Sequence, residues 1–271
     1  MGGPAAFRLR VEYDGSRFQG WQRQGTGQEA RGVRTVAGTL ERVLSEGGLR
    51  VRSLVGAGRT DAGVHALGQV AHLHLDGKVP RPGQLQILLD QGLPSDVAVH
   101  DISPCPASFH ARHDALERSY LYQLCLRRTG LAKPFVWWVK GKINKVHLKL
   151  AWKNFHGFHN IKSFSDLLES DDPRCDINTC DLEESGSILL LRVTASHFKY
   201  RQVRRMVGAA VACAQGKSDP GAIQRDLLEP TPEACLRWAA LAAPAAGLFL
   251  EGVRYEGDPP FPPLRPVTLV P

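Results

Sequence analysis

The segment GAGRTDAGVHA, residues 56–66, lies between two stretches in which apolar and polar residues alternate as in half-buried strands. Three of its first eight residues are glycine, which predicts a tight loop that a backbone or a ligand can approach closely. Arg59, Asp61 and His65 are its reactive side chains. The carboxylate of Asp61 could act as a nucleophile, or it could cap the turn and pair with Arg59. The spacing alone leaves both alternatives open.

The sequence around this loop predicts a first α/β half. A helix begins near Val33 and ends at the Gly47-Gly48 pair, and a second helix follows Pro82 as far as Leu89. Period-two alternation predicts strands at residues 7–11, 50–55, 69–75 and 96–102.

A second α/β half begins near Phe109, which divides the chain into residues 1–108 and 109–256. Thr231-Pro232 is a typical helix start, with a capping hydroxyl followed by proline in the first turn. Cys175–Cys180 is assigned to a loop, and residues 257–271, which contain six prolines, to an extended tail. Apolar periodicity predicts strands at 119–126, 187–195 and 247–255 and helices at 145–154, 200–214 and 232–242.

The order of elements predicts an α/β (α+β) fold. The two halves are expected to share a broad mixed, largely antiparallel sheet with helices on one side. A catalytic cleft is expected between the halves.

Composition narrows the functional class. With 271 residues, 43% of them hydrophobic, the chain can bury a sizeable core, and its net charge of +7 favours a polyanionic partner. The six cysteines form no C-x-x-C pair, so we expect reduced thiols without disulfides or zinc. No apolar run approaches eighteen residues, and only MGGPAA precedes the first strand, so we expect a cytoplasmic protein with no membrane span and no targeting segment.

Positive charge is concentrated in residues 133–162, which hold seven of the ten lysines, three tryptophans and no Asp or Glu. Lys142, Lys145, Lys149 and Lys153 recur at three- and four-residue intervals, which places them on one side of a helix. This segment is either a solvated surface or a wall that binds RNA phosphates.

The segment 200–214 predicts a helix with a cationic face. Arg201, Arg204 and Arg205 lie opposite the apolar residues, where Arg201 and Arg205 are either solvated or in contact with phosphate. His72 and His74 alternate on a strand without a third ligand at a plausible spacing, so we expect surface positions and no metal site.

The segment GRTDAGVHA, residues 58–66, resembles the catalytic motif of the TruA-type tRNA pseudouridine synthases. Nine contiguous residues agree, and the resemblance extends from about residue 7 to residue 255. The other motifs of that family follow in order: Phe18-Gln19-Gly20-Trp21-Gln22, Arg34-Thr35-Val36 with Leu40-Glu41, Phe109-His110-Ala111-Arg112, Tyr120-Leu121-Tyr122, FKYRQVRRMVG at 198–208 and Gly247-Leu248-Phe249-Leu250.

The resemblance implies a role for each matching residue. Asp61 would be the catalytic carboxylate, and Arg204 would pair with it and hold it ionised. The ring of Tyr120 would lie against the target base, although periodicity cannot distinguish Tyr120 from Tyr122. Arg59 would guide the flipped-out nucleotide through its phosphate.

The implied reaction converts uridine to pseudouridine in the anticodon arm of tRNA, at positions 38 to 40 in similar enzymes, without metal or cofactor. Similar enzymes act as homodimers. One alternative is a non-catalytic RNA-binding or chaperone protein with the same fold, and another is an RNA N-glycosidase that releases uracil. Ala37 stands where many relatives carry Gln, which leaves the substrate range open.

Overall fold

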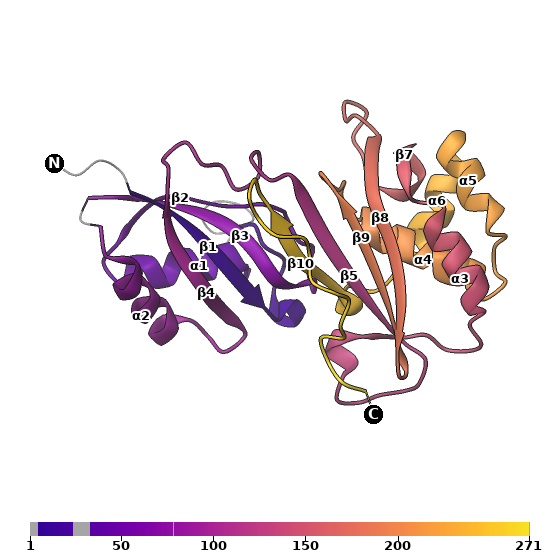
Figure 1. The fold of residues 1–271 in the computed structure, drawn as a ribbon, viewed down its shortest axis with the longest axis horizontal. Helices are drawn as coiled ribbons and strands as arrows, with labels where there is room; N and C mark the ends of the chain where they lie inside the picture. Colours follow the sequence, from indigo (N-terminus) through magenta and orange to yellow (C-terminus); the bar gives the residue numbers. More distant parts are fainter. Residues whose placement is uncertain (1–4, 24–32, 78, 271) are drawn as a thin grey trace. The chain divides into compact units, whose positions relative to one another are not determined.

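The computed structural model describes residues 5–23, 33–77 and 79–270, which divide into two compact units (Figure 1). Unit 1 comprises Met1–Leu116 and Phe249–Pro260, and unit 2 comprises Glu117–Leu248 and Phe261–Pro271. The boundary expected near residue 108 therefore lies after Leu116. Each unit is a sheet with helices on one side, which confirms the predicted α/β class.

The sheet of unit 1 is mixed and mostly antiparallel. Strand β1 pairs antiparallel with β3 and β4, and β2 pairs antiparallel with β3. Strand β10 is parallel to β3, with Phe249 opposite His65 and Leu250 opposite Ala66. The strands are β1 (Ala5–Tyr13), β2 (Arg50–Gly56), β3 (His65–Asp76), β4 (Val97–Cys105) and β10 (Leu248–Arg254).

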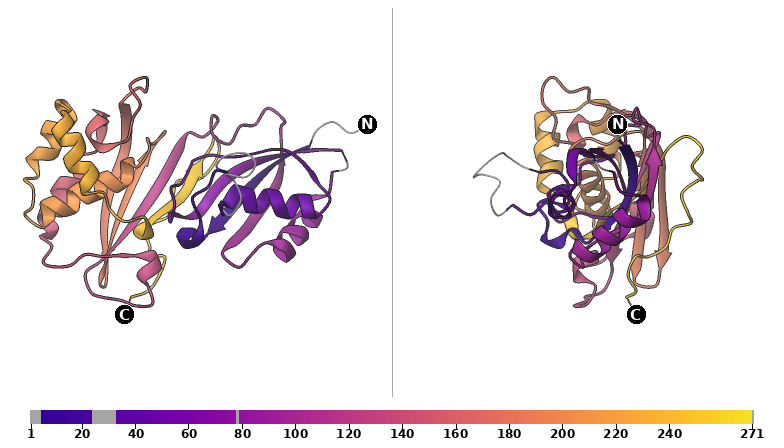
Figure 2. Two further views of the ribbon diagram at one scale, coloured as in Figure 1. Left: turned by 180° about the vertical axis from the view of Figure 1, so that it is seen from behind. Right: turned by 90° about the vertical axis from the view of Figure 1, so that its left-hand side faces the viewer.

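Two helices, α1 (Val36–Glu46) and α2 (Pro82–Gly92), lie on one side of this sheet, in front of the strands in the left panel of Figure 2. The Thr35 hydroxyl caps α1 by accepting a hydrogen bond from the Gly38 amide at 3.3 Å. Leu40 of α1, Leu85 of α2 and Leu9 of β1 are fully buried. Each buried leucine contributes roughly 1.5–3 kcal/mol, so this apolar layer stabilises the unit.

The segment Phe109–Arg112 covers the region of His72 and Tyr255 in unit 1. The Ala111 amide donates to His72 Nδ1 at 3.0 Å, and the Ala111 carbonyl accepts from the Tyr255 hydroxyl at 2.7 Å. The Phe109 and Tyr255 rings lie 5.2 Å apart. This motif therefore ties β3 to the chain that follows β10.

Residues 247–255 are expected to form the last strand of the second half. The strand exists as β10, but it pairs with β3 of unit 1. Alternation along a strand identifies its two faces and carries no information on which strand lies beside it.

In unit 2 the strand order is β5-β9-β8-β7, all antiparallel, with β6 parallel to β5. Four helices, α3 to α6, lie together on one side of β8 and β9 (Figure 1). The strands are β5 (Glu117–Cys125), β6 (Trp137–Trp138), β7 (Gly157–Asn160), β8 (Arg174–Ser185) and β9 (Ile188–Ala195). The helices are α3 (Lys145–Lys153), α4 (Gln202–Ala214), α5 (Gly221–Leu228) and α6 (Pro232–Ala240).

The expected loop at Cys175–Cys180 is wrong, because this segment belongs to strand β8. Cys175, Ile177 and Cys180 are buried, while the residues between them are charged or polar. Only three apolar residues mark the buried face, too few for a clear period of two. Strands β6 and β7 and helix α5 were also missed, since each is short.

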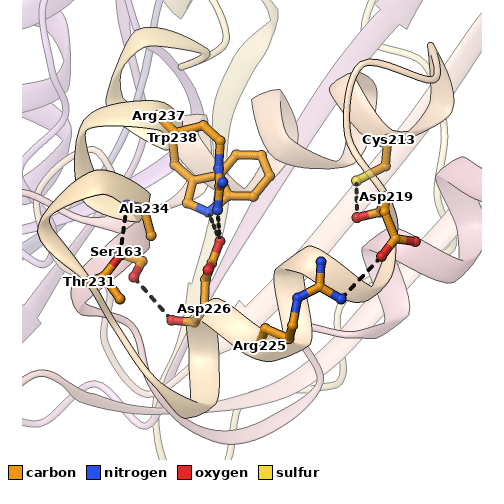
Figure 3. A network of polar contacts seen from close by, with 9 residues as sticks. All are labelled: Ser163, Cys213, Asp219, Arg225, Asp226, Thr231, Ala234, Arg237 and Trp238. Carbon is orange, nitrogen blue, oxygen red and sulfur yellow. Dashed lines mark hydrogen bonds and ion pairs between the residues drawn. The ribbon is translucent and has the colours of Figure 1, made fainter.

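Asp226 joins helices α5 and α6 in unit 2 (Figure 3). Its Oδ2 accepts from the Trp238 indole nitrogen at 2.7 Å and pairs with the Arg237 guanidinium. The Asp226 carbonyl accepts from the Ser163 hydroxyl at 3.0 Å. A 9% exposed carboxylate with these donors is satisfied, so it serves the packing of the helices.

The segment 256–270 forms neither helix nor strand, as expected, yet from Phe261 onward it packs on unit 2. Arg192 donates to the Pro262 carbonyl at 2.8 Å, and the Val267 amide donates to Gln123 Oε1 at 2.7 Å. Leu264 is buried. This segment is therefore part of the folded unit.

All six cysteines are free thiols. In the described part of the chain, no cluster of three or more His, Cys, Asp or Glu side chains could hold a metal ion. Among those same residues, none of the helices combines the length and hydropathy that a membrane crossing requires.

Candidate active site

The loop that carries Asp61 connects β2 to β3 and is fixed by hydrogen bonds along its length. The Ala57 amide donates to the Val70 carbonyl at 2.7 Å. The Gln69 side-chain amide donates to the Gly58 carbonyl at 2.7 Å, and its oxygen accepts from the Gly58 amide at 3.3 Å. The Thr60 hydroxyl lies 2.8 Å from the Tyr13 hydroxyl. This loop is therefore held rigidly on the sheet of unit 1.

A second segment, Phe18–Trp21, packs against the same loop. The Trp21 amide donates to the Thr60 carbonyl at 3.2 Å, and the Gly63 amide donates to the Phe18 carbonyl at 3.2 Å. Gly20 has φ 98°, and a Cβ on it would lie 2.4 Å from the Thr60 oxygen. Only glycine permits this approach, which explains the Phe18-Gln19-Gly20-Trp21 motif.

His65 is held by hydrogen bonds on the sheet side of this loop. Its side chain is 1% exposed, and its Nδ1 accepts from the Gly15 amide at 3.1 Å and lies 3.1 Å from Asp14 Oδ1. The ring stacks on Phe249 with centroids 4.7 Å apart. Because Nδ1 accepts a hydrogen bond from the Gly15 backbone amide, the His65 ring holds the end of the loop against the segment that follows β1.

Asp61 and Arg59 are the charged side chains that the loop presents. Thr60, between them, is buried, whereas Arg59 is exposed and Asp61 is half-buried. The Asp61 carbonyl accepts from the Val64 amide at 3.2 Å, which fixes the turn. The loop therefore holds a half-buried aspartate on a fixed backbone.

Tyr120 and Tyr122 of β5 differ in their surroundings. Tyr122 is fully buried, and its hydroxyl donates to the Pro244 carbonyl at 2.7 Å. A Cβ on Gly247 would lie 2.6 Å from the Tyr122 ring, so the ring fills the core there. The Tyr120 ring packs edge-on against Phe198 at 5.1 Å. Tyr122 is thus a core residue, while Tyr120 is buried to a lesser degree, at 8% exposed.

Arg204 is held at its backbone and its side chain. Its Nε donates to the Ala243 carbonyl at 2.8 Å, and its own carbonyl accepts from the Ala243 amide at 2.9 Å. Burial raises the pKa of Tyr122 well above its usual value, and the Arg204 guanidinium offsets part of this rise. Sequence reasoning missed Ala243, because a residue that acts through its backbone has no side-chain signature.

Arg205 does not lie on the exposed face expected for it. Its side chain is 6% exposed, pairs with Asp166 and donates to the Ser165 carbonyl at 3.0 Å. Arg201 is half-exposed, lies 3.4 Å from Asp166 and has φ 59°, a left-handed conformation just before α4 begins. The expected cationic face is wrong for Arg205, because its buried side chain pairs with Asp166, a partner from another segment that helical periodicity cannot reveal.

The four expected lysines are all exposed, but they do not share one helix. Helix α3 begins at Lys145, after the cap Asn144, so Lys142 precedes it. Lys145 pairs with Glu184 of β8, which supplies an acid that segment 133–162 itself lacks. Lys149 and Lys153 remain on the helix.

The expected site residues lie in both units. Asp61 and Arg59 belong to unit 1, and Tyr120 and Arg204 belong to unit 2. The pairing of Asp61 with Arg204 stays a prediction.

The sequence predicts a surface position for His72. This prediction is wrong, because only 3% of the residue is exposed. The segment Phe109–Arg112 covers it, and its ring lies 4.7 Å from His110 and 4.9 Å from His74. Burial, with smaller contributions from His110 and His74, lowers the pKa of His72 to about 4. His72 is therefore neutral in the folded protein near neutral pH.

We expect His72 to make the protein less stable in mild acid. Between pH 6.5 and about 4, His72 binds a proton in the unfolded chain but not in the folded protein. The unfolding free energy therefore decreases as the pH is lowered through this range. The fall is up to about 3 kcal/mol for this residue. Urea titrations of wild type and His72→Gln should show a flatter pH dependence in the variant. Exposed His100→Gln is the control, and an equally steep fall in both variants would contradict this origin.

A family model described as tRNA pseudouridine synthase matches residues 10–114 and 151–256. The match covers more than half of the chain, and several relatives exceed 30% identity over nearly their full length. The chain belongs to the tRNA pseudouridine synthase family and is an isomerase.

Several relatives that it resembles are named tRNA pseudouridine synthase A. The protein of Sinorhizobium fredii is 36% identical over 256 residues, which is 92% of this chain and 99% of that protein. The protein of Beijerinckia indica is 36% identical over 93% of this chain and 95% of its own length. A Bacillus protein, from strain KSM-64, is 32% identical over 92% and 99%.

Proposed function

We propose that this enzyme converts uridine to pseudouridine in the anticodon arm of tRNA, at positions 38 to 40, with Asp61 as its catalytic carboxylate. The observation that carries this proposal is the Asp61 loop, which Gln69, Tyr13 and Trp21 fix in place and which carries Asp61 as a half-buried residue. The relatives named tRNA pseudouridine synthase A support the substrate class.

The reaction breaks the bond between uracil N1 and ribose C1′ and forms a bond from C5 to C1′. The proton on C5 leaves and N1 gains one, so the atoms balance. Asp61 assists this exchange in its ionised form, and fixed hydrogen bonds around the loop keep it in position.

The other residues bind and orient the nucleotide. A uridine inside a stem reaches Asp61 only after it flips out, and exposed Arg59 would hold its phosphate. Arg204, anchored on Ala243, would pair with the Asp61 carboxylate and hold it in position. Tyr120, packed on Phe198, would offer its ring to the base.

The cellular context completes the proposal. The enzyme would act in the cytoplasm, as a homodimer and without a small-molecule cofactor. Mapping pseudouridine in RNA from cells with and without the protein tests the target sites. Loss of pseudouridine at positions 38 to 40 alone is expected, and unchanged tRNA with losses in another RNA would contradict the assignment.

The lysines give a separate prediction for RNA affinity. Changing Lys142, Lys145, Lys149 and Lys153 to glutamine should weaken tRNA binding and flatten its salt dependence, by roughly 0.7–0.9 log units per decade of salt for each phosphate that is no longer bound. The saturated single-turnover rate should stay within a few-fold, because none of these lysines is assigned to the base.

Lys145→Gln alone removes one of the four positive charges, so it should flatten the salt slope by at most one contact and is the graded control for the quadruple variant. If the quadruple variant keeps the parent's affinity and salt slope, this lysine segment is an ordinary solvated surface.

A further inference from the structure

A cleft of about 730 Å³ lies in unit 1 between α1 and β2, outside the Asp61 loop. Strand β2 pairs with β3, and within the described residues no other strand covers its second edge. The register shifts between Val51 and Ser53, so the edge is irregular at the cleft. The charged residues that line the cleft are Arg23, Arg34, Glu41, Arg42 and Arg52.

The charge of this cleft is strongly positive, with four arginines and one glutamate. Arg34 is committed to Asp96 through two hydrogen bonds of 2.7 Å. Arg42 pairs with Glu46 at 2.8 Å, but both side chains are more than half exposed, and such pairs are weak enough to exchange partners. Arg52 and Arg23 are also exposed.

Glu41 is the one acid among the lining residues. Burial raises its pKa, while the charge of Arg23 lowers it, so Glu41 and Arg23 interact. Glu41 therefore competes with any anion that Arg23 could bind.

Backbone hydrogen bonds of the segment Gly20–Trp21 connect helix α1, which borders the cleft, to the Asp61 loop. The Val36 and Ala37 amides at the start of α1 donate to the Gly20 and Trp21 carbonyls at 3.2 and 3.0 Å. The Trp21 amide in turn donates to the Thr60 carbonyl, beside Asp61. A polymer that follows this cleft would run beside the segment that also supports Asp61.

We propose that the cleft between α1 and β2 binds backbone phosphates of the substrate RNA, with Arg23, Arg42 and Arg52 as their partners. The inference rests on the proposed function and adds a second RNA site to it. Guanidinium groups bind phosphate in bidentate fashion. Arginines from a helix, a strand and a loop suit successive phosphates of a chain, whereas a small phosphate compound would occupy only one or two of them.

The test is tRNA binding by Arg42→Gln/Arg52→Gln at several salt concentrations, with an unmodified tRNA transcript as the probe. Removing two phosphate partners should reduce the salt slope by about 1.4–1.8 and the affinity at 0.1 M salt by about 10- to 50-fold. The control is Arg174→Gln/Arg225→Gln, which removes two exposed arginines that pair with Asp172 and Asp219. In the control variant, the salt slope and the affinity should each change by no more than about a third of the change seen in Arg42→Gln/Arg52→Gln.

A second variant, Glu41→Gln, should change affinity in the opposite direction. It removes the carboxylate that competes for Arg23, so tRNA should bind more tightly, by about 2- to 5-fold. Damage to the fold would weaken binding, so a gain separates the proposal from a structural effect. The gain should shrink as the pH falls, because Glu41 protonates in the parent.

Three outcomes would overturn the inference. They are an unchanged salt slope in Arg42→Gln/Arg52→Gln, an equal loss of affinity in the control, and uridine monophosphate binding that depends on these arginines while tRNA binding does not. Failure of the proposed function has another signature, namely no pseudouridine from the wild-type enzyme. If the wild-type enzyme forms pseudouridine and the cleft variants bind tRNA as tightly as the parent, the proposed phosphate binding by the cleft is refuted and the proposed function is not.

Discussion

Replacing Asp61 with asparagine is expected to abolish pseudouridine formation while folding and tRNA binding stay nearly unchanged. The amide keeps the shape of the side chain and loses its negative charge. The loop should keep its structure, because it is held by backbone groups and by Gln69, Tyr13 and Trp21. Removing a catalytic carboxylate normally costs many orders of magnitude in rate.

The measurement is single-turnover pseudouridine formation at saturating enzyme. Asp101→Asn, which changes an exposed carboxylate on β4 of the same unit, is the matched control and should retain the parent's rate. Activity of Asp61→Asn within about tenfold of the parent would remove Asp61 from the mechanism.

Arg204→Ala and Arg205→Ala are expected to fail in different ways. Arg205 is 6% exposed, pairs with Asp166 and donates to the Ser165 carbonyl, so its removal leaves that buried carbonyl without its donor and should reduce the unfolding free energy by about 1–3 kcal/mol. Arg204 is the proposed partner of Asp61. Its removal should reduce the rate per folded molecule at least tenfold more than the removal of Arg205 does.

Both quantities should be measured, the rate on folded protein and the unfolding free energy in urea. Equal rates per folded molecule in the two variants would count against the pairing of Arg204 with Asp61.

Most elements of the fold could be predicted from periodicity, because long strands and amphipathic helices bury one face. Strand β9 and helix α4 lie close to their predicted ranges for this reason. The pairing of β10 with β3 could not be predicted, since it joins residues far apart in the chain. Strand β8 escaped detection because its buried residues are few and its exposed positions are charged or polar.

The candidate site was predicted in part by residue type and in part by resemblance. Glycine density identified the Asp61 loop, while the roles of Tyr120 and Arg204 came only from the family's motifs. Side-chain contacts distinguish residues that spacing could not, since Tyr122 donates to Pro244 and Arg205 pairs with Asp166 inside unit 2. Both partners are distant in sequence, which is why periodicity could not find them.

The central claim is that this chain rearranges uridine within tRNA, and nucleoside analysis of a treated transcript tests it most directly. Purified enzyme would be incubated with an unmodified tRNA transcript, which is then digested and separated into nucleosides. We predict that pseudouridine appears in an amount equal to the uridine consumed, with no free uracil. Bound tRNA with unchanged uridine would indicate a binding protein, and released uracil would indicate a glycosidase; either result would contradict the claim.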